Sequence, residues 1–162
     1  MQYFQDYMHG NVCFGCGTEN PEGLQIKSYW EGDRAICIWE SEKKYHGWAN
    51  LMAGGIIATI IDCHCMGFAM ADAYKREGRE LDSLPAYRYA TGTMNIKYLL
   101  PTPNNQPVKL IAWVTEVKGR KTVIQCEVWS GENKTAEAEV IGIRVFDSSK
   151  EEDKSSIFAE GK

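Results

Sequence analysis

Two glycines followed by an acidic residue form the clearest candidate for chemistry in this sequence. Gly54 and Gly55 open an apolar, helix-like segment, and Asp62 follows two turns later. Glycines at a helix start leave backbone N–H groups uncovered at the positive end of the helix dipole, where an anion or a developing oxyanion is stabilised. Asp62 projects about 200° round the helix from His64. Such a carboxylate is either hydrogen-bonded to a neighbouring strand or subunit, or acts as a general base or nucleophile.

The six cysteines offer a second candidate, a metal site. Cys13 and Cys16 have the Cys-x-x-Cys spacing of half a zinc knuckle, and Cys63 and Cys65 form a second pair. A zinc site needs its ligands to converge, but residues two apart on a helix point to different faces. We therefore predict no metal site. The alternative is a tight glycine-containing turn with two small buried thiols.

The elements that position these groups are one helix and a set of strands. Apolar residues recur every three or four positions over residues 54–77, which predicts a single long helix. Alternating runs at 24–30 and 34–39 predict a hairpin, and runs at 87–100, 108–117, 122–129 and 136–146 predict four more strands. The pattern favours an α+β fold, an antiparallel sheet of five to six strands wrapped round the helix. We predict a single domain at residues 1–146 and a polar, loosely ordered tail at 147–162.

Composition limits the possible partners. A chain of 162 residues suits one domain, and a net charge of −4 argues against a nucleic-acid binder that neutralises phosphates. The apolar run at 53–61 is far shorter than the roughly 20 residues of a membrane span. The first residues lack the basic and apolar regions of a secretory signal. We expect a cytoplasmic protein with no membrane or nucleic-acid partner.

Several motifs in order along the chain resemble one family. They are Cys13 to Gly17, Asn20-Pro21-Glu22-Gly23-Leu24, Ala53-Gly54-Gly55 with Asp62, Asn95 to Pro103, Gly119-Arg120-Lys121 and Ala136 to Glu139. Together they resemble the hotdog-fold acyl-coenzyme A thioesterase superfamily, in particular its phenylacetate-pathway type. The resemblance runs from about residue 11 to 146 and implies the hotdog fold, hydrolysis of an acyl-coenzyme A thioester and no metal or redox cofactor.

The resemblance also implies roles for individual residues. Gly54 would offer its N–H to the thioester oxygen, Asp62 would be the general base or nucleophile, and Thr91 would hold the water. Further residues are expected to contact the substrate, either around the thioester or at the coenzyme A phosphates: Gly55, Asn50, His46, Met66, Lys97, Arg120 and Lys121. Arg88 is a further basic candidate, and Asn50 is also positioned to cap the helix.

Two positions depart from the family pattern. Relatives carry His where this chain has Ala53, and often Asn or Gln where it has Gly47. Losing one oxyanion donor costs on the order of 10²- to 10³-fold in rate. His46, Asn50 or His64 could compensate, although His64 fits a hydrogen-bonded core histidine better. The departures leave open an alternative function, a non-hydrolytic protein that binds acyl-coenzyme A or an aromatic ligand.

Subunit assembly is expected from the fold that the resemblance implies. Such a sheet leaves an edge strand open, and pairing of two subunits would cover it. We expect a homodimer, and a homotetramer as the larger alternative. In the dimer, Asp62 of one chain would face the Gly54 helix start of the other.

Overall fold

One long helix and six strands make up the body of the molecule. The computed structural model describes residues 1–159. The elements are β1 (Ser28–Glu31), β2 (Arg34–Trp39), α1 (Gly54–Arg76), β3 (Tyr87–Tyr98), β4 (Val108–Lys118), β5 (Lys121–Ser130) and β6 (Asn133–Asp147), with short 3-10 helices η1 (Phe4–Tyr7), η2 (Lys43–Tyr45) and η3 (Glu151–Ser155). The predicted helix and strands are confirmed, with small shifts of their ends.

The strands form one antiparallel sheet in the order β1-β2-β4-β5-β6-β3. Three tight turns join neighbouring strands, and each has a glycine with positive φ: Gly32 at 61°, Gly119 at 59° and Gly131 at 58°. That conformation is open to glycine without steric cost. The twelve-residue strand β3 lies at one edge of the sheet.

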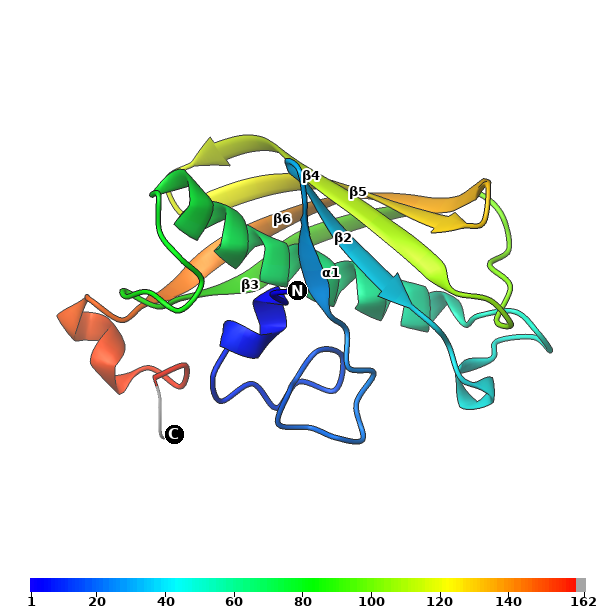
Figure 1. Ribbon diagram of the computed structural model, residues 1–162, viewed down its shortest axis with the longest axis horizontal. Helices are drawn as coiled ribbons and strands as arrows, with labels where there is room; N and C mark the ends of the chain where they lie inside the picture. The colour runs from blue at the N-terminus through cyan, green and yellow to red at the C-terminus, as the bar shows by residue number, and fades with distance from the viewer. Residues whose placement is uncertain (160–162) are drawn as a thin grey trace.

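α1 runs along one face of the sheet, and the sheet curves over it (Figure 1). Ile57, Ile60 and Phe68 of the helix are buried, and small residues such as Ala112 and Ala138 on the strands let it approach closely. By length and composition alone α1 could cross a membrane, but 61% of its most apolar window is buried inside the fold. The sheet therefore accounts for the apolar character of the helix, which has the central position predicted for it.

A buried polar chain fixes the N-terminal segment against α1. Gln5 Nε2 donates to Ser28 Oγ at 3.0 Å, and Ser28 Oγ lies 2.8 Å from Nδ1 of His64. All three side chains are fully buried. The Ser28 hydroxyl accepts from Gln5 and has its own proton available to donate to Nδ1 of a neutral His64 ring. A Cβ on Gly67 would lie 2.5 Å from Gln5 Nε2, so a glycine is needed where Gln5 crosses the helix.

Two expectations differ from the structure. The first strand begins at Ser28 and not at residue 24, because Leu24 and Ile26 donate their N–H groups to Phe14 and Gly15 of the preceding loop. In place of the loosely ordered tail predicted from 147, β6 continues through Asp147 and η3 follows. Ser148 exchanges two hydrogen bonds with Ala86, at 2.8 and 3.0 Å, which hold the start of this tail. Positions 160–162 of the predicted tail lie outside the described residues.

Candidate active site

Asp62 is half-buried on α1 and has one partner on the sheet. Thr91 of β3 donates a hydrogen bond from Oγ1 to Asp62 Oδ1. The register of β3 against β6 shifts between Thr91 and Thr93, with Gly92 as the additional residue. A bulge of this kind re-aims the side chains on either side of it. The irregular strand thus turns Thr91 toward the helix, and the water-holding role that the family resemblance implies for Thr91 stays a prediction.

A cavity of about 460 Å³ opens beside this pair. Asp62, Cys63 and Met66 form its helix wall, and residues 88–91 of β3 form the facing wall. The N-terminal segment 8–13 with Cys16 and the tail residues 157–159 complete the lining. Met66 therefore lines the same cavity as Asp62 and Thr91, and its expected contact with the substrate stays a prediction. The two terminal segments were not predicted to contribute, because neither has a periodic pattern that fixes its place.

Gly54 begins α1 beside a different cavity of about 410 Å³. Within the described part of the chain, the N–H groups of Gly54 and Gly55 have no acceptor, as expected for the first residues of a helix. The Tyr98 hydroxyl donates to the Gly54 carbonyl at 2.8 Å, and Tyr98 forms one side of this cavity. Tyr98 was not predicted as a site residue, although its place within the Asn95 to Pro103 motif was a usable signal.

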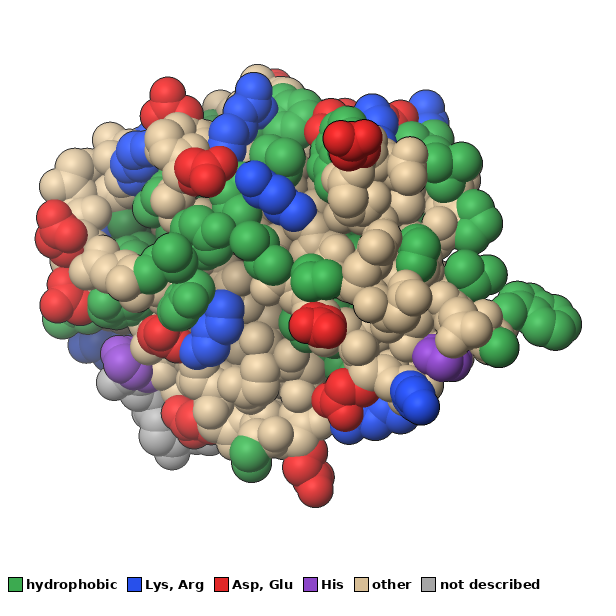
Figure 2. Space-filling view, turned by 45° about the vertical axis from the view of Figure 1, so that its right-hand side comes forward, with side chains coloured by type: hydrophobic (Ala, Val, Ile, Leu, Met, Phe, Trp, Pro, Cys, Tyr) green, Lys and Arg blue, Asp and Glu red, His purple; other side chains and the backbone are tan. Residues whose placement is uncertain are grey.

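Hydrophobic side chains surround this second cavity and project from the molecule. Trp48 is 84% exposed, and Leu99 and Leu100 are also exposed. Figure 2 shows hydrophobic side chains standing out at its right-hand edge, on the side that holds the loop before α1. Exposed apolar groups next to open N–H donors suit contact with another molecule.

Asp62 and Gly54 do not meet within one chain. Eight residues of helix separate them, which is about 12 Å at ~1.5 Å per residue. They also line different cavities. A single chain therefore presents the carboxylate and the helix start as two separate half-sites.

The residues expected near the helix start are only partly placed there. Gly55 is the second residue of α1 and is exposed, with open space where a Cβ would stand. The predicted cap by Asn50 is wrong, because Ala53 occupies the N-cap position and no side chain caps the helix. Asn50 has φ 65° and accepts from Asn104 N at 2.8 Å through its carbonyl. His46 pairs with Met52, and neither His46 nor Asn50 lines the Gly54 cavity.

The predicted basic residues do not converge. Lys97 lies opposite Glu137 on β6, whereas Lys121 lies opposite Ile143, which is six residues or roughly 20 Å further along that strand. Arg120 is exposed in the turn beside Lys121. Arg88, by contrast, lines the Asp62 cavity, and its guanidinium donates to the His9 carbonyl at 3.3 Å. The geometry brings only Arg88 of these four to the carboxylate.

His64 does not replace the imidazole that the family carries before the glycines. Its ring is fully buried, and burial lowers the pKa of His64 to about 4, although a backbone hydrogen bond partly opposes the shift. The ring is therefore neutral near pH 7 and faces the Ser28 hydroxyl, not a cavity. The sequence interpretation of a hydrogen-bonded core histidine is confirmed.

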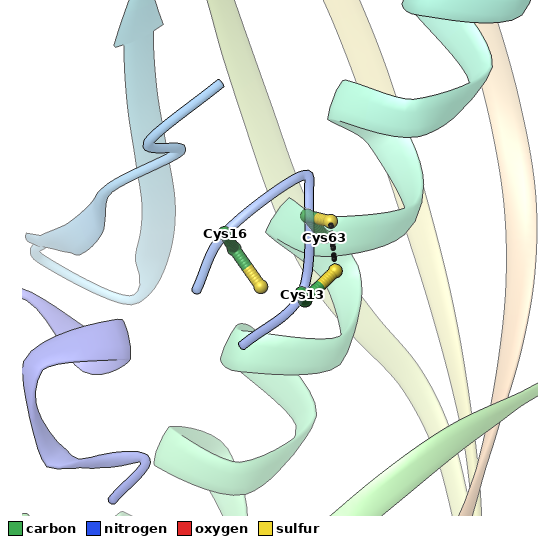
Figure 3. Close-up of side chains that lie close together, drawn as sticks. All are labelled: Cys13, Cys16 and Cys63. Carbon is green, nitrogen blue, oxygen red and sulfur yellow. Dashed lines mark hydrogen bonds between the residues drawn. The ribbon is translucent and has the colours of Figure 1, made fainter. Parts of the chain in front are cut away.

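Three of the cysteines converge, contrary to expectation. The sulfur atoms of Cys13, Cys16 and Cys63 all lie within 4.8 Å of one another (Figure 3). Cys63 does join the Cys-x-x-Cys loop, while Cys65 is not part of the group. A hydrogen bond from the Cys63 thiol stabilises the Cys13 thiolate, so the pKa of Cys13 is lowered to about 5 and that of Cys63 is raised. Cys13 is exposed, so the expectation of two buried thiols holds only for Cys16.

Comparison with known proteins identifies the family. A sequence profile of the thioesterase superfamily matches residues 49–137, more than half of the chain. The chain belongs to the thioesterase superfamily. A thioesterase superfamily protein of Shewanella loihica PV-4 is 30% identical, with 73% of this chain and 89% of that one covered and a TM-score of 0.60. The predicted hotdog fold and thioesterase family are confirmed.

Two other similar proteins carry names that mention coenzyme A. The acyl-coenzyme A thioesterase THEM4 of Bos taurus is 25% identical over 132 residues, which is 80% of this thioesterase-superfamily chain. The chain spans about half (49%) of the length of that protein. A structure of smu.793 from Streptococcus mutans, bound to acetyl CoA, has a TM-score of 0.59 at 14% identity, with 74% and 87% of the two chains covered. At that identity the likeness concerns the fold.

Proposed function

We propose that this chain hydrolyses an acyl-coenzyme A thioester to a free acid and coenzyme A. The observation that carries the proposal is the hydrogen bond from Thr91 to Asp62 at the wall of an open cavity. The thioesterase superfamily match and the similarity to an acyl-coenzyme A thioesterase support the reaction class. The acetyl-CoA-bound neighbour of the same fold supports coenzyme A as the carrier.

Asp62 supplies the carboxylate for the reaction. Thr91 donates to Oδ1, so Oδ2 is left to accept a proton from water or to attack the thioester carbonyl. In the first route the water adds to the carbonyl and Asp62 holds its proton; in the second an acyl-aspartyl anhydride forms and is hydrolysed. In either route coenzyme A leaves as the thiolate and is protonated.

The helix start stabilises the negative charge that develops on the thioester oxygen. The N–H groups of Gly54 and Gly55 point along the axis of a 23-residue helix and have no acceptor within the described residues. Ala53 and Gly47 provide no side-chain donor here. The backbone donors therefore carry this function without the imidazole present in relatives.

A second copy of the chain is required to assemble the site. The separation of about 12 Å along α1 is too long for a single carbonyl to touch both Asp62 and Gly54. In a homodimer the Asp62 cavity of one protomer would face the Gly54 cavity of its partner. The exposed edge strand β3 carries both Thr91 and Tyr98, so pairing near this edge would bring the half-sites together. A homotetramer would add a second interface.

The test is release of coenzyme A from short-chain, medium-chain, long-chain and aryl acyl-coenzyme A esters. Chromatography should detect the product, because six cysteines would react with a thiol dye. We expect Asp62→Asn to lose on the order of 10²- to 10⁴-fold in kcat while retaining ester binding.

Asp72→Asn is the matched control. Asp72 lies on the same helix and forms an ion pair with Arg76 at 2.7 Å, so the same chemical change should leave kcat near wild type. Undiminished turnover in Asp62→Asn would contradict the assigned role. Binding without turnover in wild type, across all esters, would replace hydrolysis with the non-hydrolytic binding function.

A further inference from the structure

The three-cysteine cluster, Cys13, Cys16 and Cys63, is not used by the proposed reaction. Cys13 and Cys16 come from the N-terminal loop, and Cys63 comes from α1, so residues 47 to 50 positions apart are brought together (Figure 3). Cys13 Sγ and Cys63 Sγ lie 3.9 Å apart, and all three sulfurs lie within 4.8 Å. Two sulfurs bound to one tetrahedral Zn²⁺ at ~2.3 Å would lie about 3.8 Å apart.

The loop geometry is arranged to hold sulfur atoms. The Gly15 N–H points to Cys13 Sγ at 3.3 Å, and the Asn11 side-chain amide points to Cys16 Sγ at 3.4 Å. N–H donors aimed at sulfur stabilise the thiolate form, which is the form that binds metal. Two of the three sulfur atoms, those of Cys13 and Cys16, therefore each have an N–H donor of their own.

Glycines make the close approach of loop and helix possible. A Cβ on Gly15 would overlap Cys63 Sγ. A Cβ on Gly17 would lie 2.5 Å from Cys13 N and 2.6 Å from Asn11 O, so a side chain there would open the turn. The turn is closed by the Gly17 N–H, which donates to the Cys13 carbonyl at 2.8 Å.

We propose that Cys13, Cys16 and Cys63 bind a Zn²⁺ ion through three thiolates. Thiolate ligands select zinc and other soft or borderline metals over Mg²⁺ and Ca²⁺. Among the described residues, no His, Asp, Glu or fourth Cys joins the same cluster. All three cysteines line the cavity of Asp62, so the fourth coordination position faces that cavity and takes a solvent or ligand atom from it. The ion would also tie the N-terminal loop to α1 beside Asp62.

The test uses the full-length, reduced, metal-free protein and Co²⁺ as an anaerobic spectroscopic probe. We expect a single Co²⁺ per chain, a thiolate-to-cobalt charge-transfer band and visible bands typical of tetrahedral coordination. Zn²⁺ should displace the Co²⁺ and abolish these bands. Cys13→Ser and Cys63→Ser should each weaken binding by more than the roughly 10- to 100-fold that changes outside the ligand set cost.

Cys126→Ser is the matched control, because Cys126 is a buried cysteine outside the cluster. It should bind Co²⁺ like wild type. If Cys63→Ser fails to fold by circular dichroism, the exposed Cys13 supplies the decisive variant. The proposal is overturned if reduced wild type shows no charge-transfer band, or if Cys13→Ser binds as tightly as wild type. A disulfide among these cysteines, with no Co²⁺ binding after its reduction, would also overturn it.

Discussion

Three polar groups of α1, those of His64, Asp62 and the Gly54 N–H, lie in two regions with opposite environments. His64 joins Gln5 and Ser28 in a fully buried chain of hydrogen bonds. Asp62 and the N–H of Gly54 instead face cavities. His64, Asp62 and the Gly54 N–H are all polar groups on a mostly apolar helix. Residue type therefore does not separate structural from functional roles. What separates them is whether the fold itself supplies the partners. Changes in the buried region should therefore cost stability, and changes in the open region should cost activity.

Gly54→Pro should produce the largest effect among changes at the helix start. Proline removes the N–H yet suits the first residue of a helix, and Ala53 before it is already extended at φ −61° and ψ 137°. We expect kcat to fall by on the order of 10²- to 10³-fold, as for other lost oxyanion donors, with little change in Tm. Gly54→Ala keeps the N–H and adds a Cβ at an ordinary 3.6 Å from Tyr98, so it is the control. Equal losses in both variants would argue against a role for the N–H.

Mixing two inactive variants would show whether the open half-sites come from different protomers. Randomly reassembled dimers of Asp62→Asn and Gly54→Pro contain heterodimers in which one composite site has both wild-type groups. We expect recovery of about a quarter of wild-type activity in an equimolar mixture. Measurement of coenzyme A release after co-refolding would detect it. No recovery, with mixed dimers demonstrated by mass spectrometry, would place both groups in the same protomer.

The buried region predicts a specific dependence of stability on pH. Burial lowers the pKa of His64 to about 4 in the folded state, against about 6.5 when unfolded. The unfolded chain therefore binds more protons below pH 6.5, and stability falls as the pH falls from 6.5 toward 4. The free energy of unfolding should drop by roughly 2 kcal/mol between pH 7 and pH 5. Urea titrations at both pH values measure it. In His64→Asn the free energy of unfolding should differ much less between pH 7 and pH 5. If the variant keeps the full difference, groups other than His64 cause it.

Thr91→Val should give the smallest effect and act on activity alone. Valine keeps the shape of the side chain but cannot donate to Asp62. Loss of one hydrogen bond to a charged group corresponds to about a tenfold fall in kcat. Thr93→Val is the control on the same strand, opposite Ile141 of β6. If the two variants lose activity equally, the strand and not the hydroxyl is responsible.

Local pattern was enough to predict the helix and strands. The helix was expected at residues 54–77 and runs from Gly54 to Arg76, because its period and its glycines are local properties. Asp62, Met66 and Thr91, which the family resemblance named as site residues, line one cavity, and their roles stay predictions. Their convergence depends on the helix packing against β3 and on the register shift next to Thr91.

Features that depend on irregular segments could not be predicted from the sequence. The N-terminal loop is held by the packing of Gln5 at Gly67 and by backbone hydrogen bonds from Leu24 and Ile26. None of these contacts produces a periodic pattern in the sequence. Cys63 joins the loop cysteines without Cys65, and the spacing of the two cysteine pairs does not indicate this. Likewise, Lys97 and Lys121 each lie within a quoted motif, but they pair with positions of β6 that are six residues apart and lie on opposite sides of that strand.

The position of α1 in the chain also determines the order in which the fold can be completed. The helix is apolar enough to resemble a membrane span, yet four of the six strands that form its sheet follow it in sequence. During synthesis the helix leaves the ribosome before β3, β4, β5 and β6 exist to cover it. Fragments that end before β3 would therefore expose the apolar surface of α1 to solvent. Aggregation of such fragments would follow from the uncovered apolar face of the helix.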